Sequence, residues 1–318
     1  MKDIMKTLIT GITGMIGSHF ANATKSRGWD TYGIARNSAS SRIAAIPDAS
    51  VIRCDILDRE LLDSVIRRVQ PELVVHMAAQ AFNGVSWDAE ESTHLTNYQG
   101  TVNVLRATKR YVPHSKVLLA CSSAEYGDVD ISDCPLVEDR PLRPVSPYGV
   151  SKAATESLGY QYFSNYGIPV YLPRLFIHVG TGHPPATAIQ NFARQLALIA
   201  KGKLSPIIKV GNLSSARDFI DVRDGVEGMM LLLKNGLPGE AVNICTGTSY
   251  SIKEVLSILI EISGLNVVVE EDPNLLRLSD EPLLLGDVSK LRSLGWTQKH
   301  KIRDTLQDVF DDWMKRVN

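Results

Sequence analysis

Two side chains able to exchange a proton stand four residues apart, at Tyr148 and Lys152. On a helix this spacing places them on one face, about one turn apart. A lysine charge beside a phenol favours the phenolate, so the pair could pass a proton to or from a substrate oxygen. The same spacing also occurs on ordinary exposed helix faces, so the chemistry needs support from other motifs.

Ser122 provides such support because it ends a predicted buried strand over residues 116–122. Strand ends in doubly wound sheets are where ligands bind, and a hydroxyl there can hydrogen-bond an oxygen that is being oxidised or reduced. The alternative is a serine that only satisfies the local backbone. Ser123 follows it and is a candidate substrate contact.

A glycine-rich segment near the N-terminus predicts a dinucleotide site. The segment from Gly11 to Gly17 lies between a predicted strand at 7–10 and a predicted helix at 15–27. Glycines there permit a tight turn and let a pyrophosphate approach the positive end of the helix. The alternative is a merely flexible turn. The expected contacts in this segment are Gly11, Thr13, Gly14, Met15, Ile16 and Gly17.

The residues after the next two predicted strands favour NADP, with NAD as the alternative. No acid follows the second strand to bind ribose hydroxyls, and Arg36 stands there instead. An arginine can pair with the 2′-phosphate of NADP, unless it is simply a solvated surface residue. Asp55 and Ile56 end the next apolar stretch, where the aspartate can hydrogen-bond the adenine amino edge.

Apolar strands alternate with amphipathic helices along most of the chain, which predicts a doubly wound parallel α/β sheet (a Rossmann fold). A smaller C-terminal α/β region is expected after residue 176, where glycines and prolines interrupt the pattern. We assign 1–176 to the dinucleotide-binding domain, with returning segments at about 214–248. Residues 177–213 and 249–318 are assigned mainly to the substrate region.

Composition excludes several other classes of protein. The 34 Lys and Arg nearly balance 35 Asp and Glu, so neither a nucleic-acid surface nor an anionic membrane patch is indicated. The four cysteines form no Cys-x-x-Cys pair, which favours reduced thiols in the cytoplasm over disulfides or a zinc site. No metal, secretory signal or membrane span is expected.

The glycine segment at 11–17, Ser122, and the pair of Tyr148 and Lys152 follow one another in this order along the chain. Together they resemble the extended short-chain dehydrogenases/reductases, and the resemblance covers essentially the whole chain. The resemblance implies an NAD(P)-dependent enzyme with Ser122, Tyr148 and Lys152 as its catalytic set. It also implies that Tyr148 and Lys152 contact the cofactor. Many relatives pair through two helices per subunit, so a homodimer is expected by analogy. Further family positions that would lie against the cofactor are Ala78, Ala79, Gln80 and Asn97.

Two later segments resemble the nucleotide-binding parts of GDP-mannose 4,6-dehydratases and GDP-4-keto-6-deoxy-mannose reductases. They run from Lys209 to Asp218 and from Arg277 to Asp287. Two arginines suit a diphosphate, although they could instead form ion pairs with Asp218 and Asp280. The expected substrate contacts here are Lys209, Arg217, Arg277 and Asp280, with His178 at a strand end near the predicted cleft.

The expected reaction depends on Ala124. In the resembling dehydratases, a glutamate two residues after the catalytic Ser or Thr helps remove a proton from C5 of the sugar. Alanine cannot do this, and Glu125 would point to the opposite side if the strand continued. The sequence thus favours reduction of a GDP-4-keto-6-deoxy-hexose at C4. Three alternatives remain open: a GDP-mannose-type 4,6-dehydratase, a nucleotide-sugar 4-epimerase or C4 dehydrogenase, and a catalytically silent dinucleotide-sensing protein.

Overall fold

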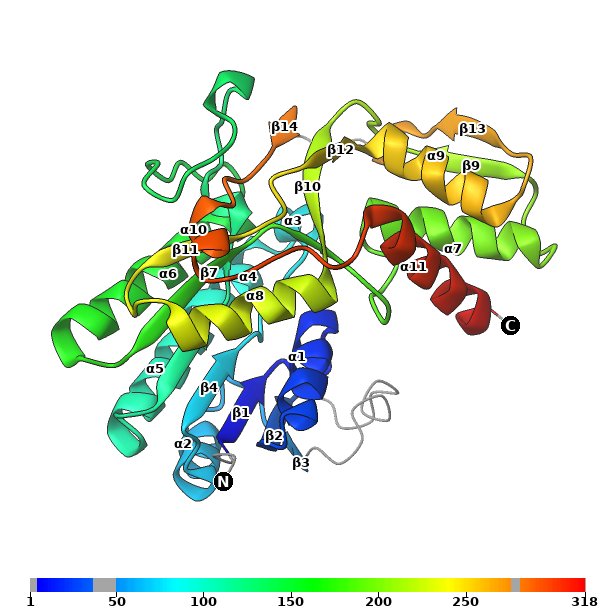
Figure 1. Cartoon of the computed structure of the whole chain (residues 1–318). Coiled ribbons are helices and arrows are strands. Elements are labelled where there is room, and N and C mark those ends of the chain that lie inside the picture. The colour runs from blue at the N-terminus through cyan, green and yellow to red at the C-terminus, as the bar shows by residue number, and fades with distance from the viewer. Residues whose placement is uncertain (1–4, 37–49, 276–280, 318) are drawn as a thin grey trace.

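A computed structural model describes residues 5–36, 50–275 and 281–317. Its main feature is a parallel sheet with strand order β3-β2-β1-β4-β5-β7-β11, and β6 pairs with β7 (Figure 1). These strands are β1 (Lys6–Thr10), β2 (Asp30–Ala35), β3 (Ser50–Arg53), β4 (Leu73–His76), β5 (Lys116–Leu119), β6 (Cys121–Ser122), β7 (Val170–Leu175) and β11 (Ala241–Ile244). The doubly wound fold predicted from the alternation is confirmed.

Helices cover both faces of this sheet. Successive residues of β1, Leu8 and Ile9, are both inaccessible to solvent but belong to separate apolar clusters on opposite faces. Such double burial explains why parallel strands are continuous apolar runs in sequence. On one face lie α1 (Met15–Ser26), α8 (Val222–Asn235) and α10 (Ser289–Ser293); on the other lie α2 (Arg59–Val69), α5 (Gly100–Tyr111) and α6 (Pro147–Tyr166).

The smaller region has its own apolar cluster, built between three helices and short strands. Figure 1 shows this region beside the carboxyl end of the large sheet. Its strands are β8 (Ile177–Val179), β9 (Ile207–Val210), β10 (Ala216–Asp221), β12 (Ser249–Ser251), β13 (Val268–Glu271) and β14 (Leu283–Leu284); its helices are α7 (Ala188–Ala200), α9 (Ile252–Ser263) and α11 (Ile302–Arg316). After β10 the chain returns to the large sheet through α8 and β11, while α10 also packs there. The domain boundaries remain an interpretation.

Several element ends have local causes. Gly167, with φ of 67°, ends α6 in the left-handed conformation that glycine accepts without strain. Ser251 and Glu254 form a capping box at the start of α9. The strand predicted over 116–122 is interrupted at Ala120.

The sheet order places β1 and β4 side by side at the point where the strand order reverses. In such sheets ligands bind beyond the carboxyl ends of the strands at this reversal. Short elements follow the strands of the large sheet: α3 (Asn83–Ser86), α4 (Glu90–His94), the π-helix η2 (Leu95–Gln99), and the 3₁₀ turns η3 (Ser123–Glu125) and η4 (Ile131–Asp133). A further 3₁₀ turn, η5 (Pro273–Leu275), follows β13 in the smaller region. Within the described residues, no helix is long and apolar enough to cross a membrane.

Candidate active site

The glycine turn between β1 and α1 has the geometry that a pyrophosphate requires. Gly11 has φ of 69°, and a Cβ placed on it would lie 2.7 Å from the backbone nitrogen of Ala78. A Cβ on Gly17 would collide with the carbonyl of Gly11, so the helix can pack this closely only with glycine. Gly14 is the N-cap of α1 and supplies no side-chain cap. The first N–H groups of α1, which begins at Met15, are therefore suited to an anion.

The turn is completed by Thr13 and Ile16, which are both half-buried. Their side chains therefore remain partly open to a ligand at the turn. Both residues stay predicted cofactor contacts.

The residues expected at the ribose and adenine follow β2 and β3, next to the glycine turn. Arg36 comes directly after β2 and is exposed. The Asp55 Oδ1 atom accepts the Leu57 N–H at 2.9 Å, so one carboxylate oxygen shapes the local turn. Ile56 is buried, and its carbonyl accepts a hydrogen bond of 3.0 Å from Asn103 Nδ2 on α5. Arg36 is thus the residue of this group most accessible to a phosphate.

Lys152 is buried on α6 and held in place by the break in the neighbouring strand. Its Nζ donates a 2.7 Å hydrogen bond to the carbonyl of Ala120, between β5 and β6. This bond engages the Ala120 carbonyl at the interruption between the two strands. The same Nζ lies 5.9 Å from the centre of the Tyr148 ring. The structure therefore brings the phenol and the ammonium together as the spacing predicted.

A close backbone contact brings Tyr148 to the turn that carries Ser122. A Cβ on Gly149 would lie only 2.5 Å from the carbonyl oxygen of Ala124 in η3, so glycine lets α6 approach this turn. The Tyr148 N–H donates to the Oγ of Ser86 at 3.2 Å, which connects α6 to α3. Ser122, Tyr148 and Lys152 are thus assembled where η3 meets the first turns of α6.

Asn97 lies in the π-helix η2 and is only 2% exposed. Its Oδ1 accepts the Gln80 N–H at 2.8 Å, and its Nδ2 donates to the Gln80 carbonyl and to Ser151 Oγ. Ser151 Oγ in turn donates to the Tyr148 carbonyl at 2.7 Å. The Asn97 side chain, expected against the cofactor, is therefore engaged by protein groups. Its observed contacts hold the loop after β4 against α6, and Ala79 and Gln80 stay half-buried in that loop.

Ser122 and Glu125 form a reciprocal capping box around η3. Ser122 Oγ accepts the Ala124 N–H at 3.2 Å, and Glu125 Oε1 accepts the Ser122 N–H at 2.6 Å. The strand ends at Ser122, so the assumption that it continues through Glu125 was wrong. The Glu125 side chain nevertheless turns into the protein and is 0% exposed. Burial and the neighbouring Glu156 raise the pKa of Glu125 well above its usual value. Ala124 remains half-exposed.

Arg217 is almost buried at β10 and pairs with the segment before β14. Its Nη1 donates to the Glu281 carbonyl at 2.6 Å, and its Nη2 lies 3.5 Å from the Glu281 carboxylate. Asp218, the ion-pair partner considered as the alternative, accepts hydrogen bonds from Thr246 and Gly247. Arg277 and Asp280 lie outside the described residues.

The remaining expected substrate residues are spread out. Lys209 Nζ contacts Glu270 Oε2 at 2.5 Å across the β9–β13 pair and is exposed. His178 Nδ1 shares a hydrogen bond of 2.8 Å with the Phe176 carbonyl, and its ring packs against Gly225 of α8. Ser123 is 2% exposed within η3. Substrate contact by these three residues stays a prediction, and the packing of His178 favours a structural role.

Several residues that shape the site were not identified from the sequence. The bonds of Ser86 and Ser151 and the close approach of Gly149 join segments far apart in the chain, and no local pattern indicates them. Glu125 did have a signal, because Ser122-x-x-Glu125 is a capping-box pattern. No sequence pattern indicated Glu156 and Arg174, the buried residues that lie next to Glu125.

One sheet edge holds the residues singled out by their chemistry. They are the glycine turn at β1–α1, a serine at the end of β6, and a tyrosine and a lysine on α6. This fold and site define the class of the NAD(P)-dependent short-chain dehydrogenases/reductases. The family model described as GDP-mannose 4,6 dehydratase matches residues 8–309, and the chain belongs to this family. The resemblance found from the motifs, and the expectation of an enzyme, are confirmed.

Individual relatives fall into more than one activity. The chain is 28% identical to GDP-6-deoxy-D-mannose reductase of Pseudomonas aeruginosa over 98% of both chains. It superposes with a TM-score of 0.85 on the structure of RMD from Pseudomonas aeruginosa complexed with NADPH, at 26% identity over 98% of this chain and 99% of that one. It superposes on a UDP-glucose 4-epimerase of Thermus thermophilus in complex with NAD with a TM-score of 0.88. The two are 28% identical over 97% of this chain and 99% of that one.

Proposed function

We propose that this chain is an NADP(H)-dependent reductase acting at C4 of a nucleotide-linked 4-keto-6-deoxy-hexose, with GDP as the nucleotide. The observation that carries this proposal is the arrangement of η3. Ala124, which occupies the position of the dehydratase glutamate, has no group able to move a proton. The carboxyl group of Glu125 is buried and engaged with the Ser122 N–H, so it does not replace that base. A site with Ser, Tyr and Lys but no such base supports redox chemistry alone.

The cofactor is a nicotinamide dinucleotide, in line with the NADPH and NAD held by the two related structures. The glycine turn would hold its pyrophosphate, and exposed Arg36 would pair with a 2′-phosphate. When bound, the reduced nicotinamide supplies a hydride to C4. Arg36 is the reason that we favour NADPH over NADH.

The chain's own residues would supply the proton and hold the sugar oxygen. Ser122 Oγ accepts a hydrogen bond from the Ala124 N–H, which leaves its hydroxyl hydrogen to donate to the C4 oxygen. Tyr148 gives its phenolic proton to the same oxygen as the hydride reaches carbon, so that the ketone becomes an alcohol. The Lys152 charge, fixed by the Ala120 carbonyl, stabilises the phenolate left behind.

Recognition of the nucleotide diphosphate is assigned to Arg217, with Arg277, Asp280 and Lys209 as further predicted contacts. Arg217 belongs to a fixed network through Glu281, which immediately follows the segment containing Arg277 and Asp280. A guanidinium held in this way can present forked donors to phosphate oxygens. The GDP assignment is supported by the name of the reductase relative.

Purified chain mixed with NADPH and GDP-4-keto-6-deoxy-mannose should oxidise NADPH in proportion to the substrate supplied. Tyr148→Phe should bind NADPH but turn over at least about 100-fold more slowly, because the proton donor is lost. Inert wild type that instead removes water from GDP-mannose would reassign the chain to the dehydratases. Wild type without turnover on either substrate, but with NADPH binding unchanged by Tyr148→Phe, would favour a dinucleotide sensor.

A 4-epimerase is the second candidate, because the epimerase relative superposes as well as the reductase structure does. An epimerase returns the hydride to the same sugar, so its cofactor is recycled and should copurify tightly bound. A reductase must exchange cofactor at each turnover. Denaturing the purified chain and quantifying released dinucleotide separates the two: stoichiometric NAD would support the epimerase.

A homodimer through the Asn97-bearing and Lys152-bearing helices is part of this proposal. Large apolar side chains are exposed on both segments, including Leu95 and Tyr98 of η2 and Tyr160 of α6. A contiguous cluster of exposed apolar side chains is typical of a surface that a partner covers. Light scattering should give twice the chain mass, and Tyr98→Lys should reduce that mass to the monomer value.

A further inference from the structure

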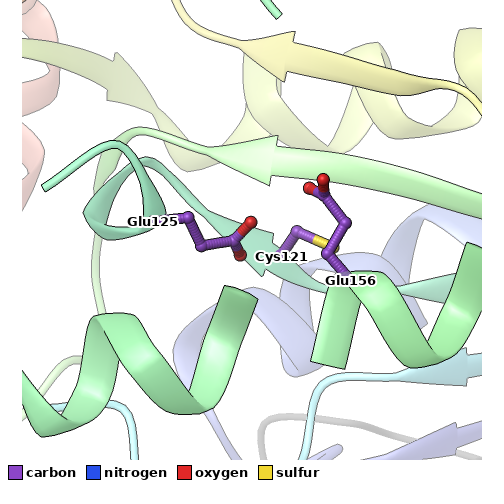
Figure 2. A group of neighbouring side chains, drawn as sticks. All are labelled: Cys121, Glu125 and Glu156. Atoms are coloured by element: carbon purple, nitrogen blue, oxygen red, sulfur yellow. The ribbon is translucent and has the colours of Figure 1, made fainter. Parts of the chain in front are cut away.

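A buried pair of carboxyl groups lies directly behind Ser122. Glu125 of η3 and Glu156 of α6 lie on either side of Cys121 of β6 (Figure 2). The thiol and one oxygen of each carboxyl group are all within 4.8 Å of one another. The reaction outlined above uses none of these three side chains.

Arg174 of β7 provides the positive charge in this cluster. Its Nε and Nη2 donate to the two oxygens of Glu156 at 2.8 and 2.6 Å, and its Nε lies 3.9 Å from Glu125 Oε2. One guanidinium therefore faces two carboxyl groups in a region closed to solvent. Because a buried unpaired charge is costly, the cluster is expected to bind one positive charge more.

A proton meets this need better than a metal ion. Both oxygens of Glu156 are occupied by Arg174, whereas Glu125 Oε2 is buried and has no hydrogen-bond donor among the described residues. An oxygen of Glu125 lies within 4.8 Å of an oxygen of Glu156, and two charged carboxylates this close in a buried site repel each other, so one of them holds a proton. Glu125 is thereby the neutral member of the pair.

The other oxygen of Glu125 contacts the proposed catalytic serine. Oε1 accepts the Ser122 N–H at 2.6 Å, while Ser122 Oγ accepts the Ala124 N–H. The carboxyl group thus fixes the backbone of Ser122 at the end of β6, and the capping box fixes the direction of its hydroxyl. A neutral carboxyl group can do this without placing a full negative charge beside a reacting oxygen.

We propose that Glu125 is a positioning residue for Ser122, acting from the buried pair that it forms with Glu156. This inference rests on the proposed function of Ser122 as the residue that orients the C4 oxygen. It adds to that function an acid that never touches the substrate but holds the serine that does.

The first test is a double-mutant cycle with Ser122→Ala. Glu125→Leu removes the hydrogen-bond acceptor and should lower kcat about 10- to 100-fold, with the KM for NADPH changed less than about 2-fold. Glu125→Gln keeps an acceptor for the Ser122 N–H and should retain kcat within about 3-fold. In the Ser122→Ala background, Glu125→Leu should lower kcat by less than about 2-fold more.

Two outcomes of the cycle would overturn the inference. One is an equal loss of kcat from Glu125→Leu with and without the serine, which would mean that Glu125 acts independently of Ser122. The other is a Glu125→Gln chain that is folded yet as impaired as Glu125→Leu. Thermal unfolding of each variant shows whether it is folded.

The second test needs no substrate, so it separates this inference from the proposed reaction. Hydrogen exchange at the Ser122 amide should be slow in wild type and in Glu125→Gln and at least about 10-fold faster in Glu125→Leu, because only the last lacks the acceptor. Equal protection in all three chains would overturn the positioning role. If the wild type shows no turnover but has the predicted exchange pattern, the proposed reaction is wrong and the contact between Glu125 and Ser122 is supported.

The pH dependence of stability gives a third readout. Burial and Glu156 raise the pKa of Glu125, so the stability that its protonation contributes is present below its ordinary pKa and is lost as pH rises through the raised value. Glutamine has no such proton to lose, so Glu125→Gln should become more stable relative to wild type as pH rises above the ordinary pKa of a carboxyl group. A difference in stability between the two chains that does not change with pH would show that Glu125 is charged in the folded chain throughout. The charged or titratable groups facing Glu125 are Cys121 of β6, Glu156 of α6 and Arg174 of β7, and Lys152 of α6 acts on Cys121.

Discussion

At the residue scale, Arg36 is the residue that we propose favours NADPH over NADH. It is exposed directly after β2, where a carboxylate would repel a 2′-phosphate and a guanidinium attracts it. Arg36→Ala should therefore raise the KM for NADPH about 10-fold or more, through the loss of charge-assisted hydrogen bonds, and should leave the KM for NADH nearly unchanged.

Arg110→Ala is the matched control, because Arg110 is also exposed but lies on α5, away from the end of β2. Steady-state kinetics with both cofactors measure the effect. Equal losses for NADPH and NADH in Arg36→Ala would contradict a phosphate contact.

Local spacing predicted some site residues and not others. Tyr148 and Lys152 are four residues apart, so helical geometry alone places them together, and the structure agrees. The pairing of Arg217 with Glu281 joins residues 64 positions apart and depends on tertiary packing. Asn97 was placed by resemblance, but its internal hydrogen bonds could be known only once the loop after β4 was positioned against α6.

At the scale of elements, the packing of α6 on η3 controls the distance between Tyr148 and Ser122. Gly149→Ala would place a Cβ 2.5 Å from the Ala124 carbonyl oxygen, so α6 or η3 must move. Overpacking of this kind costs about 1 to 3 kcal/mol, and here the displacement falls between two catalytic groups. We expect kcat to fall by about 10-fold or more, because small misplacements at a reacting centre are costly.

Gly159→Ala is the control on the same helix. Its Cβ would meet the side-chain methyl groups of Leu119 and Leu172 at 2.8 Å, which can adjust without moving η3. It should lower the melting temperature with kcat preserved. If Gly149→Ala kept full activity, the contact between α6 and η3 would not set the geometry of the site.

The extents of elements were predicted less well than their existence. Continuous apolar runs identified β1 and β5, yet the strand predicted over 116–122 is broken at Ala120. At this break the Ala120 carbonyl accepts a hydrogen bond from Lys152, which lies 32 residues further along the chain. Periodicity within a segment carries no information about such a partner.

At the scale of the whole molecule, two neutral histidines tie stability to pH. Burial lowers the pKa of His76 to about 3, with a contribution from Lys152, and lowers that of His178 to about 4. Both groups are uncharged in the folded chain, so their contribution to stability is present above about pH 6.5 and is lost as pH falls towards 4. Urea unfolding should show the free energy of unfolding falling over this range.

His178→Gln isolates one of these contributions, because glutamine does not titrate. Relative to wild type it should gain up to about 1.4 kcal/mol per pH unit on acidification below pH 6.5. A His178→Gln curve parallel to wild type would show that His178 is charged in the folded chain.

The overall architecture was predictable because many short patterns agree on it. The same doubly wound sheet is required by three patterns. They are the alternation of strands and helices, the glycine turn, and the serine, tyrosine and lysine that meet at one sheet edge. The shape of the smaller region was less predictable, since its strands are short and pair across long separations, as β10 does with β14. Arg277 and Asp280 lie outside the described residues, so the nucleotide contacts there rest on the resemblance alone.

The most direct test of the central claim follows the hydride itself. NADPH carrying deuterium at its transferable position is incubated with the purified chain and GDP-4-keto-6-deoxy-mannose, and the sugar product is analysed by mass spectrometry and NMR. The account predicts one deuterium at C4 of the product for each NADP formed. An unlabelled product, or intact labelled NADPH after complete conversion of the sugar, would contradict it.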